Sequence, residues 1–168
     1  PVELTPEQEI ARVDALAERS LSPCGEGHMS ARIWGNGGEP LVLLHGNFGS
    51  WMHWIRNVEV LSQHYRVIAL DIPGFGDSAL PTVPYSAESV AQIMVDGIDA
   101  IAGKDAPVYI AGFSFGSGIG AVGVYGSSWG AFVAFMTVPL VATVLQVVMQ
   151  PGRTYQLMAT MGTTAARR

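Results

Sequence analysis

The sequence predicts an α/β fold, with a mostly parallel sheet and helices on both of its faces. Short segments that are apolar throughout alternate with longer segments of helical periodicity along the first two thirds of the chain. Strands that are apolar on both sides are typical of parallel sheets, because helices cover both faces of such a sheet. The length of 168 residues is enough for one domain with a sizeable core.

The expected elements follow one another in a regular order. A helix is expected after Thr5, because Thr is a good N-cap, Pro6 suits the first turn and Gln8 can complete a capping box. Helical spacing also runs over residues 51–61, and Ser86 can cap a further helix. The inner face of that helix is expected to consist of Val90, Ile93, Met94, Ile98 and Ile101. Strands are expected at residues 29–34 (MSARIW), 40–44 (PLVLL), 66–70 (RVIAL) and 107–111 (PVYIA).

The composition excludes several classes of function. Lys and Arg number 9 against 14 Asp and Glu, the net charge is −5 and basic residues do not cluster, so no nucleic-acid partner is expected. Cys24 is the only cysteine, which excludes an internal disulfide and a cysteine-based zinc site; neither a metal nor a cofactor is expected. Residues 1–20 are acidic and amphipathic, unlike an export signal, and the expected location is cytoplasmic.

The chain divides into two parts of different composition. All 14 acidic residues lie in the first 105 positions, and all four histidines lie before residue 65. We therefore predict a core over residues 1–123, incomplete at its C-terminal side, and an acid-free apolar tail over residues 124–168. Three interpretations of the tail stay open: a truncated or frame-altered gene, which the abrupt change favours; a membrane helix over residues 129–149, which Pro139 disfavours; or further soluble core.

The most specific motif is Gly112-Phe113-Ser114-Phe115-Gly116, a G-x-S-x-G pattern between an apolar strand and a run of small residues. In this context it predicts a sharp strand-to-helix turn that lifts Ser114 Oγ clear of the sheet in a strained backbone conformation. Gly112 and Gly116 are needed where neighbouring chain leaves no room for a Cβ. The alternative is a plain glycine-rich turn, which the flanking strand and helix disfavour.

A second motif, His45-Gly46-Asn47, follows the first of the buried strands. The backbone N–H of Asn47 is expected to face that of Phe115, and the two donors would stabilise the oxyanion that forms when Ser114 attacks a carbonyl. The alternative interpretation is a tight turn with a structural, hydrogen-bonded His45.

Two further segments have a structural interpretation. Residues 71–78 (DIPGFGDS) predict a Pro-Gly turn in which Asp71 accepts hydrogen bonds from loop amides. Gly118, Gly120 and Gly123 match the G-x-G-x-x-G pattern of dinucleotide-binding folds. They begin too far past the strand, however, and no acid follows to bind a ribose, so close packing of a helix on the sheet explains them better.

Together the segments HGNFGSWMHW, DIPGFGDS and GFSFGS, in this order, resemble the α/β-hydrolase superfamily of the serine-nucleophile type over about residues 28–123. The resemblance implies a serine nucleophile at Ser114, oxyanion-hole positions at Asn47 and Phe115, and a histidine base with an acidic partner. It also implies action on esters, thioesters, lactones, amides or occasionally C–C bonds. Epoxide hydrolases and haloalkane dehalogenases of this fold carry Asp at the centre of the elbow, so Ser114 argues against both activities.

The sequence departs from the superfamily after the elbow, where the acid and the histidine should follow. No Asp, Glu or His comes after Ser114, and the four upstream histidines are poor substitutes for the base. We therefore expect a serine hydrolase that acts on an ester-like small molecule and is impaired in this chain. Apolar side chains near Ser114 indicate an apolar acyl group. The alternative is a catalytically inactive relative with a binding or membrane-associated role; the oligomeric state is not predicted.

Overall fold

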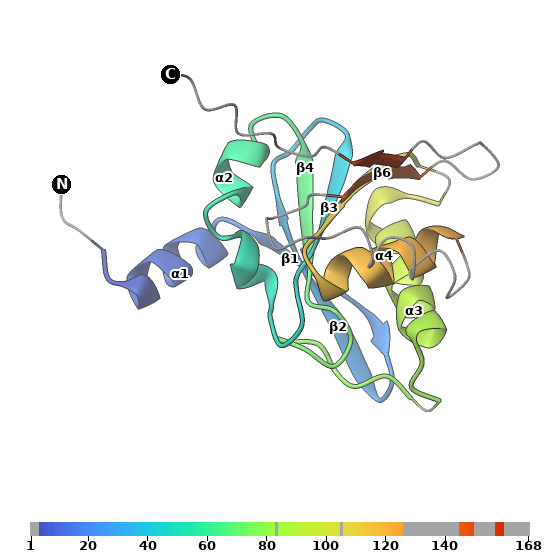
Figure 1. Cartoon of the computed structure of the whole chain (residues 1–168). Coiled ribbons are helices and arrows are strands. Elements are labelled where there is room, and N and C mark those ends of the chain that lie inside the picture. Colours follow the sequence, from blue (N-terminus) through green and yellow to red (C-terminus); the bar gives the residue numbers. More distant parts are fainter. Residues whose placement is uncertain (1–3, 83, 105, 126–144, 150–156, 160–168) are drawn as a thin grey trace, which may run out of the picture.

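A twisted mixed sheet forms the centre of the molecule (Figure 1). The computed structural model describes residues 4–82, 84–104, 106–125, 145–149 and 157–159, with side chains to residue 123. Within these residues seven strands lie in the order β1-β2-β4-β3-β5-β6-β7. Their bounds are Glu18–Cys24 (β1), Gly27–Trp34 (β2), Pro40–Leu44 (β3), Arg66–Leu70 (β4), Val108–Gly112 (β5), Leu145–Met149 (β6) and Leu157–Ala159 (β7).

The predicted α/β core is confirmed, but the sheet is mixed rather than mostly parallel. Among the described strands, β3 runs parallel to both β4 and β5, whereas β1–β2, β2–β4, β5–β6 and β6–β7 are antiparallel pairs. The turn at Gly25 and Glu26 joins β1 to β2, and strands joined by so short a turn must run in opposite directions. The apolar runs that predicted a parallel sheet correspond to the three central strands β4, β3 and β5, and only these are parallel to one another.

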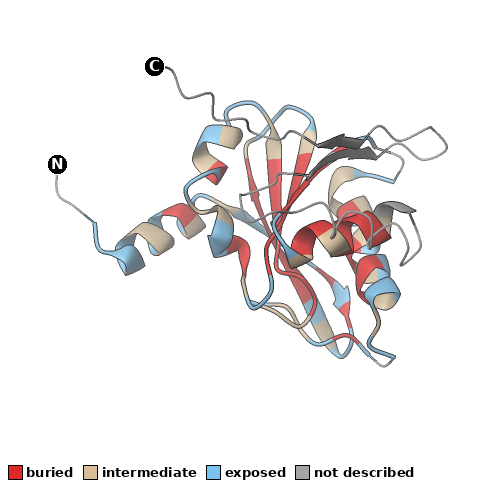
Figure 2. Ribbon diagram, in the orientation of Figure 1, coloured by how far each residue is buried: buried red, intermediate tan, exposed pale blue. Residues whose placement is uncertain are grey.

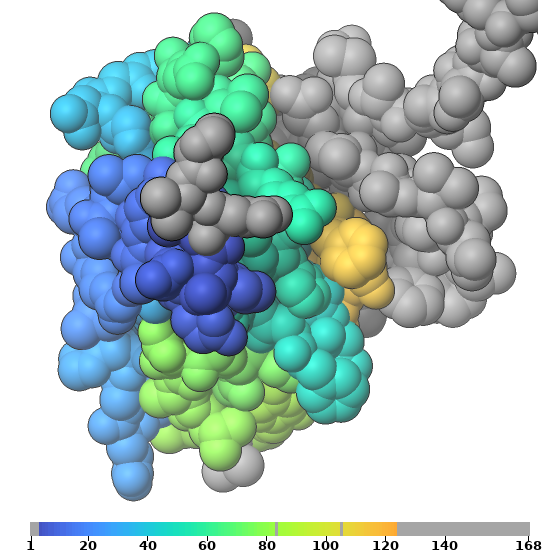
Figure 3. Space-filling model, turned by 90° about the vertical axis from the view of Figure 1, so that its left-hand side faces the viewer, coloured from blue at the N-terminus to red at the C-terminus, as the bar shows by residue number. Residues whose placement is uncertain are grey.

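Helices cover both faces of the sheet, as predicted (Figure 1). On one face lie α3 (Ala87–Ala102) and α4 (Phe115–Tyr125); on the other lie α1 (Pro6–Ala15), the 3-10 helix η1 (Trp51–Trp54) and α2 (Val58–Leu61). Figure 2 shows the buried residues concentrated along the central strands, between these two layers. Helix α1 lies beside the segment that carries η1 and α2 (Figure 3), and an ion pair between Arg12 and Glu59 joins α1 to α2.

Local signals in the sequence define several of these elements. Thr5 and Gln8 form the predicted capping box, in which each side chain accepts a hydrogen bond from the other residue's N–H. Ser86 caps α3, whose buried face includes Val90, Met94 and Ile98. Ile93 and Ile101, predicted for the same face, are partly buried against the core. The predicted bounds of β3 and β4 are confirmed.

Two elements differ from the prediction. The segment 51–61 is not one helix: η1 ends at Trp54, and α2 begins only at Val58. Trp51 and Val58 are buried on the same face of the sheet, as the apolar spacing predicts, but they belong to two short helices rather than to one. The strand β1 is absent from the prediction because most of its residues are exposed and its pattern carries no apolar run. Pairing with β2 stabilises it as the edge of the sheet.

The tail predicted over residues 124–168 lies largely outside the described residues, and so do the truncated, frame-altered and soluble-core interpretations of it. Of the proposed membrane segment 129–149, residues 129–144 lie outside the description, and residues 145–149 form β6 beside β5. In the part of the chain that the structure describes, no helix has the length and apolar character needed to cross a bilayer.

Candidate active site

Ser114 stands at a sharp turn between β5 and α4. The strand ends at Gly112 and the helix begins at Phe115, so two residues make the whole reversal. Ser114 has a φ of +53°, in the left-handed region that L residues rarely adopt, and it is exposed. The turn is closed by hydrogen bonds from Gly116 N to Phe113 O and from Ser117 N to Ser114 O, both 3.0 Å. This is the strained strand-to-helix turn that the sequence predicts.

The two glycines of the motif lie where a side chain has no room. A Cβ on Gly116 would lie 2.5 Å from the carbonyl oxygen of His45 and closer still to that of Leu44. A Cβ on Gly112 would lie 2.6 Å from the backbone nitrogen of Ser117. These neighbours are backbone atoms and cannot rotate away. The contacts of Gly116 also show that the elbow packs directly on the end of β3.

The segment after β3 forms a tight turn over residues 45–50. The carbonyl oxygen of Gly46 accepts hydrogen bonds from Gly49 N at 3.1 Å and from the Nδ1 of His45 at 2.7 Å. The Nε2 of His45 accepts the N–H of Ile72 at 2.9 Å, so the imidazole is neutral with its proton on Nδ1. Burial lowers the pKa of His45, which favours the same neutral form. The structural interpretation of His45 is therefore supported, and it is compatible with an oxyanion-stabilising turn.

The turn and the elbow meet at the point where the chain leaves the sheet in opposite directions. After β3 it passes to η1 and α2 on one face, whereas after β5 it passes to α4 on the other. Such a switch point at the carboxyl ends of parallel strands is where α/β sheets bind ligands. Phe113 N donates to Leu44 O at 3.0 Å, and the Phe113 ring packs against Gly46.

The amides expected to form an oxyanion hole are those of Asn47 and Phe115. Within the described residues, neither N–H has a hydrogen-bond acceptor. Phe115 is the first residue of α4, so its N–H belongs to the unpaired donors of a helix N-terminus. Asn47 is exposed at the tip of the turn. Both amides are thus unpaired among the described residues, as an oxyanion hole would require.

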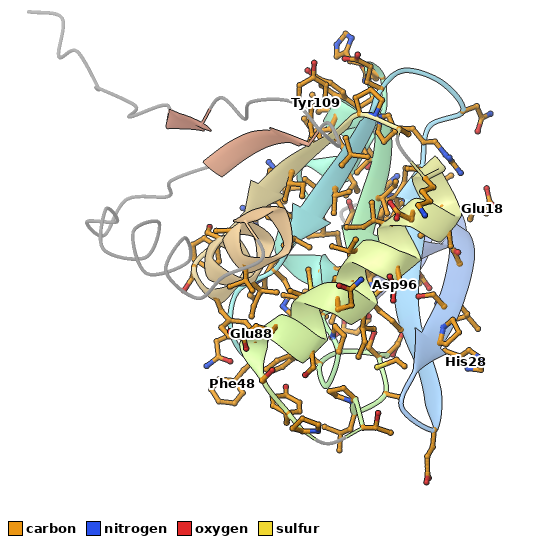
Figure 4. All side chains as sticks on the ribbon, turned by 90° about the vertical axis from the view of Figure 1, so that its right-hand side faces the viewer. Glu18, His28, Phe48, Glu88, Asp96 and Tyr109 are labelled. Atoms are coloured by element: carbon orange, nitrogen blue, oxygen red, sulfur yellow. The ribbon has the colours of Figure 1, made fainter. Side chains whose placement is uncertain are left out.

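Aromatic side chains border this end of the sheet. Phe48, which follows Asn47, is 88% exposed and has a φ of +55°. The Phe48 ring lies 6.2 Å from that of Phe75, which in turn lies 6.0 Å from Phe115. Figure 4 shows Phe48 and Tyr109 at opposite ends of the sheet. Phe48, Phe75 and Phe115 thus form a row of aromatic rings from the turn to the elbow.

Among the described residues, no hydrogen bond joins Ser114 to any of the four histidines. Both ring nitrogens of His45 are already engaged. The Nδ1 of His53 accepts the N–H of Gly46 at 3.2 Å, which leaves the proton of the neutral ring on Nε2. His28 lies at the outer edge of the molecule in β2 (Figure 4), and His64 precedes β4 at the amino end of the sheet. In the described residues no group of three His, Cys, Asp or Glu side chains is arranged to hold a metal ion.

Sequence reasoning missed a buried ionic cluster beneath the turn. Arg32 on β2 is 4% exposed and donates to Asp14, to Asp71 at 3.3 Å and to Asp77 at 2.7 Å. Its guanidinium also lies 4.7 Å from the centre of the Trp51 ring. The only available signal was a single charge within the otherwise apolar strand MSARIW. The predicted role of Asp71 as an acceptor for loop amides is confirmed by the N–H groups of Trp51 and Asp77.

The glycine pattern at residues 118–123 lies inside α4. A Cβ on Gly120 would lie 3.0 Å from Leu44 and 3.5 Å from Ile110, and one on Gly123 would contact Val95 of α3. Small residues here let α4 approach the sheet and α3 closely, which supports the packing interpretation.

Comparison with known proteins decides the family. The family described as alpha/beta hydrolase fold matches residues 39–124, which contain the turn, the Asp71 loop and the elbow. The chain belongs to this family. The predicted resemblance began earlier, at about residue 28.

Similar proteins include several hydrolases. This α/β-hydrolase is 36% identical over 86 residues to the 2-hydroxy-6-oxo-6-(2'-aminophenyl)hexa-2,4-dienoic acid hydrolase of Metapseudomonas resinovorans, covering 49% of this chain and 29% of that protein. It is 30% identical over 109 residues to the soluble epoxide hydrolase of a Corynebacterium species, covering 65% and 32%. The chain thus spans about a third or less of the length of these curated relatives.

Solved structures share the fold of this α/β-hydrolase. The Cif epoxide hydrolase from Acinetobacter nosocomialis superposes with a TM-score of 0.59 at 23% identity, over 77% of this chain and 44% of that one. A membrane phospholipase A described as a bacterial virulence factor superposes with a TM-score of 0.59 at 27% identity, over 68% and 38%. At 23% identity, the likeness to the Cif epoxide hydrolase shows a shared fold alone.

Proposed function

We propose that this α/β-hydrolase acts on an ester-like small molecule, with Ser114 as the nucleophile. The observation that carries the proposal is the left-handed, exposed Ser114 on a two-residue turn that abuts the end of β3. A serine kept in a strained conformation at a switch point has little structural reason to be there, because glycine would fit without strain. The serine also separates this chain from epoxide hydrolases of the fold, whose elbow carries Asp.

The reaction proposed is acyl transfer to water. Ser114 Oγ attacks the carbonyl carbon, and the N–H groups of Asn47 and Phe115 donate to the oxyanion of the tetrahedral intermediate. The leaving group then departs with a proton, and water hydrolyses the acyl-serine. The proton of Ser114 Oγ passes to water during the attack, because no described histidine is hydrogen-bonded to it. The described residues thus include the proposed nucleophile, Ser114, and the proposed oxyanion donors, Asn47 and Phe115.

The acyl part of the substrate is proposed to be apolar. Phe48, Phe75 and Phe115 form a row of aromatic rings from the 45–50 turn to the residue after Ser114. Relatives named as hydrolases of a hexadienoic acid and of a methylene succinate act on small organic acids, which supports a small-molecule substrate. Their acidic groups are not carried over to this chain.

An alkyl fluorophosphonate tests the nucleophile directly. Serine attacks the phosphorus and fluoride leaves, so the adduct is read by intact mass and located by peptide mass spectrometry. We expect one adduct, on Ser114, formed about 100-fold faster than in the same chain unfolded in urea, because amide donors of an oxyanion hole contribute about that factor or more. Ser114→Ala should abolish it. Equal rates in folded and unfolded chain would contradict the proposal.

A second candidate function is binding without catalysis. The observation that favours it is that, among the described residues, the hydrogen bonds of His45 and His53 go to backbone groups and none joins a histidine to Ser114. Hydrolysis of p-nitrophenyl acetate and octanoate separates the two candidates. A serine hydrolase shows turnover that Ser114→Ala removes and that favours the octanoate, whereas a binding protein shows the same background rate in both variants.

A further inference from the structure

We propose that Asp71 is a positioning residue for the oxyanion turn and acts from beneath it together with the backbone of Ile72. The inference deepens the proposed function and rests on it for its catalytic part. Asp71 makes no hydrogen bond to Ser114, and its effect passes through Trp51.

Two adjacent residues of the loop after β4 hold both ends of the turn over residues 45–50. At the first end, the N–H of Ile72 donates to His45 Nε2 at 2.9 Å. At the second end, Asp71 Oδ1 accepts the N–H of Trp51 at 2.7 Å. His45, Asp71 and Trp51 are all almost fully buried, so water does not compete for these bonds. Between these two anchors the turn projects the unpaired amide of Asn47.

Asp71 is itself fixed on its other side. Its Oδ2 accepts the N–H of Asp77 at 3.0 Å and a hydrogen bond from Arg32 at 3.3 Å. Gly76 packs against the carboxylate so closely that a Cβ there would lie 2.5 Å from Asp71 Cγ. Both oxygens are therefore occupied, and the carboxylate has a single orientation in which Oδ1 faces Trp51.

Arg32 ties the same arrangement to the sheet. Its guanidinium donates to Asp71 and also lies over the ring of Trp51, so Trp51 is contacted through both its backbone and its side chain. Burial disfavours the charged guanidinium, but hydrogen bonds to Asp14 and Asp77 raise the pKa of Arg32 above its usual value. The Arg32 side chain therefore stays positively charged, and its backbone belongs to β2.

The consequence for chemistry is preorganisation. An oxyanion donor contributes most when its direction is fixed before the charge develops. Two anchors within one dipeptide limit the turn to one position on the end of β3, next to the elbow. Loss of the Asp71 anchor should free the second end of the turn and let the Asn47 amide move, while Ser114 keeps its own backbone support.

Asp71→Asn and its matched control Asp14→Asn test this inference in the full chain. Each variant converts one carboxylate that Arg32 contacts into an amide, but Asp14 is on α1 and makes no contact with the turn. In Asp71→Asn, the one remaining oxygen satisfies the two donors Arg32 and Asp77 N, so the NH2 group faces the N–H of Trp51, and two donors then meet where a hydrogen bond was. We expect hydrogen exchange of the Trp51 and Gly49 amides, which are both hydrogen-bonded in the wild type, to accelerate at least 10-fold in Asp71→Asn and less than twofold in Asp14→Asn.

The rate of Ser114 labelling gives the second measurement. Corrected for the folded fraction, the maximal rate should fall about 10- to 100-fold in Asp71→Asn with the concentration of half-saturation unchanged, because a misplaced oxyanion donor costs up to about that factor. Asp14→Asn should stay within threefold of wild type. If Asp71→Asn does not fold, Arg32→Lys replaces it, with the same direction expected in both measurements.

The outcomes separate the inference from the proposed function. Equal effects of the Asp71 and Asp14 variants on amide exchange overturn the positioning role. Wild-type chain that does not label at all overturns the proposed function, and amide exchange then decides the positioning role alone. Faster exchange in Asp71→Asn without slower labelling also overturns the inference, because the anchor would then have no bearing on the site.

Discussion

The elbow at Ser114 and the turn over residues 45–50 lie side by side at the end of the sheet, but different interactions hold them. The elbow depends on close packing of backbone: Gly112 and Gly116 leave out the Cβ atoms that would collide with neighbouring backbone. The turn over residues 45–50 depends instead on polar side chains, with His45 and Asp71 as buried hydrogen-bond partners. The elbow is thus determined by the lack of side chains at its own two glycines. The turn is determined by hydrogen bonds that include residues distant in the sequence.

The difference explains how the two loops can be perturbed. Steric exclusion by backbone acts in every solution condition, because no group in it titrates. A buried network of hydrogen bonds and charges is sensitive to the loss of one partner and to protonation. The two loops should therefore respond differently to substitution and to pH.

The largest effect is expected at the charged support of the turn. Arg32→Met leaves Asp71 buried without its cation, and removal of one partner from a buried ion pair costs about 3–5 kcal/mol. Urea unfolding followed by tryptophan fluorescence measures the change. Arg56→Met, which removes an exposed arginine, should change the free energy of unfolding by less than about 0.5 kcal/mol. Similar losses in both variants would show that the buried network does not stabilise the turn.

A somewhat smaller effect is expected at the elbow. Gly116→Ala places a Cβ against the carbonyl oxygens of Leu44 and His45, and the backbone shift this requires should cost about 2–3 kcal/mol. Gly37→Ala is the matched control, because a Cβ there meets nothing within 4 Å. Urea midpoints of the two variants give the comparison. A Gly116→Ala protein as stable as Gly37→Ala would mean that β3 and the elbow do not pack as described.

The smallest effect concerns pH, and it should appear at the turn. Because burial lowers the pKa of His45, the unfolded chain takes up its proton first as the pH falls below about 6.5. The unfolded state then binds more protons than the folded one, so the free energy of unfolding falls with falling pH, by at most about 1.4 kcal/mol per pH unit for this one group. Urea unfolding at pH 7.5, 6.5 and 5.5 measures the slope.

The neutral variant His45→Gln should flatten that slope, whereas His64→Gln, at an exposed position, should keep it. A wild-type slope that survives His45→Gln would assign the pH dependence to another group and weaken the contrast between the two loops.

Much of the core could be predicted because its signals are local. PLVLL and RVIAL are buried strands whatever their neighbours are, since each contains four apolar residues in a row, at 41–44 and 67–70, which require cover on both sides. Thr5 with Gln8, and Ser86, cap helices through atoms within three residues. The elbow is also local: a serine between two glycines, at the junction of a strand and a helix, leaves few conformations for five residues.

The remaining features depend on contacts between segments far apart in the chain. The residues of β1 carry no strong strand signal, and β2 decides that they form a strand by pairing with them. The direction of each strand, and hence a mixed sheet, follows from how the segments connect in space. The break between η1 and α2 likewise leaves the apolar spacing intact, so spacing alone does not reveal it.

By itself the sequence determined the α/β class, the central strands and the position of Ser114, because each rests on residues close together in the chain. Only the tertiary structure decided how the turn over residues 45–50 is held in place. Arg32, Asp71 and Trp51 are separated by 39 and 20 positions, and their hydrogen bonds exist only once β2, β4 and η1 are packed together. In the sequence, Arg32 and Asp71 each have many possible partners. In the folded protein both are buried, and only the few groups within hydrogen-bond distance can pair with them.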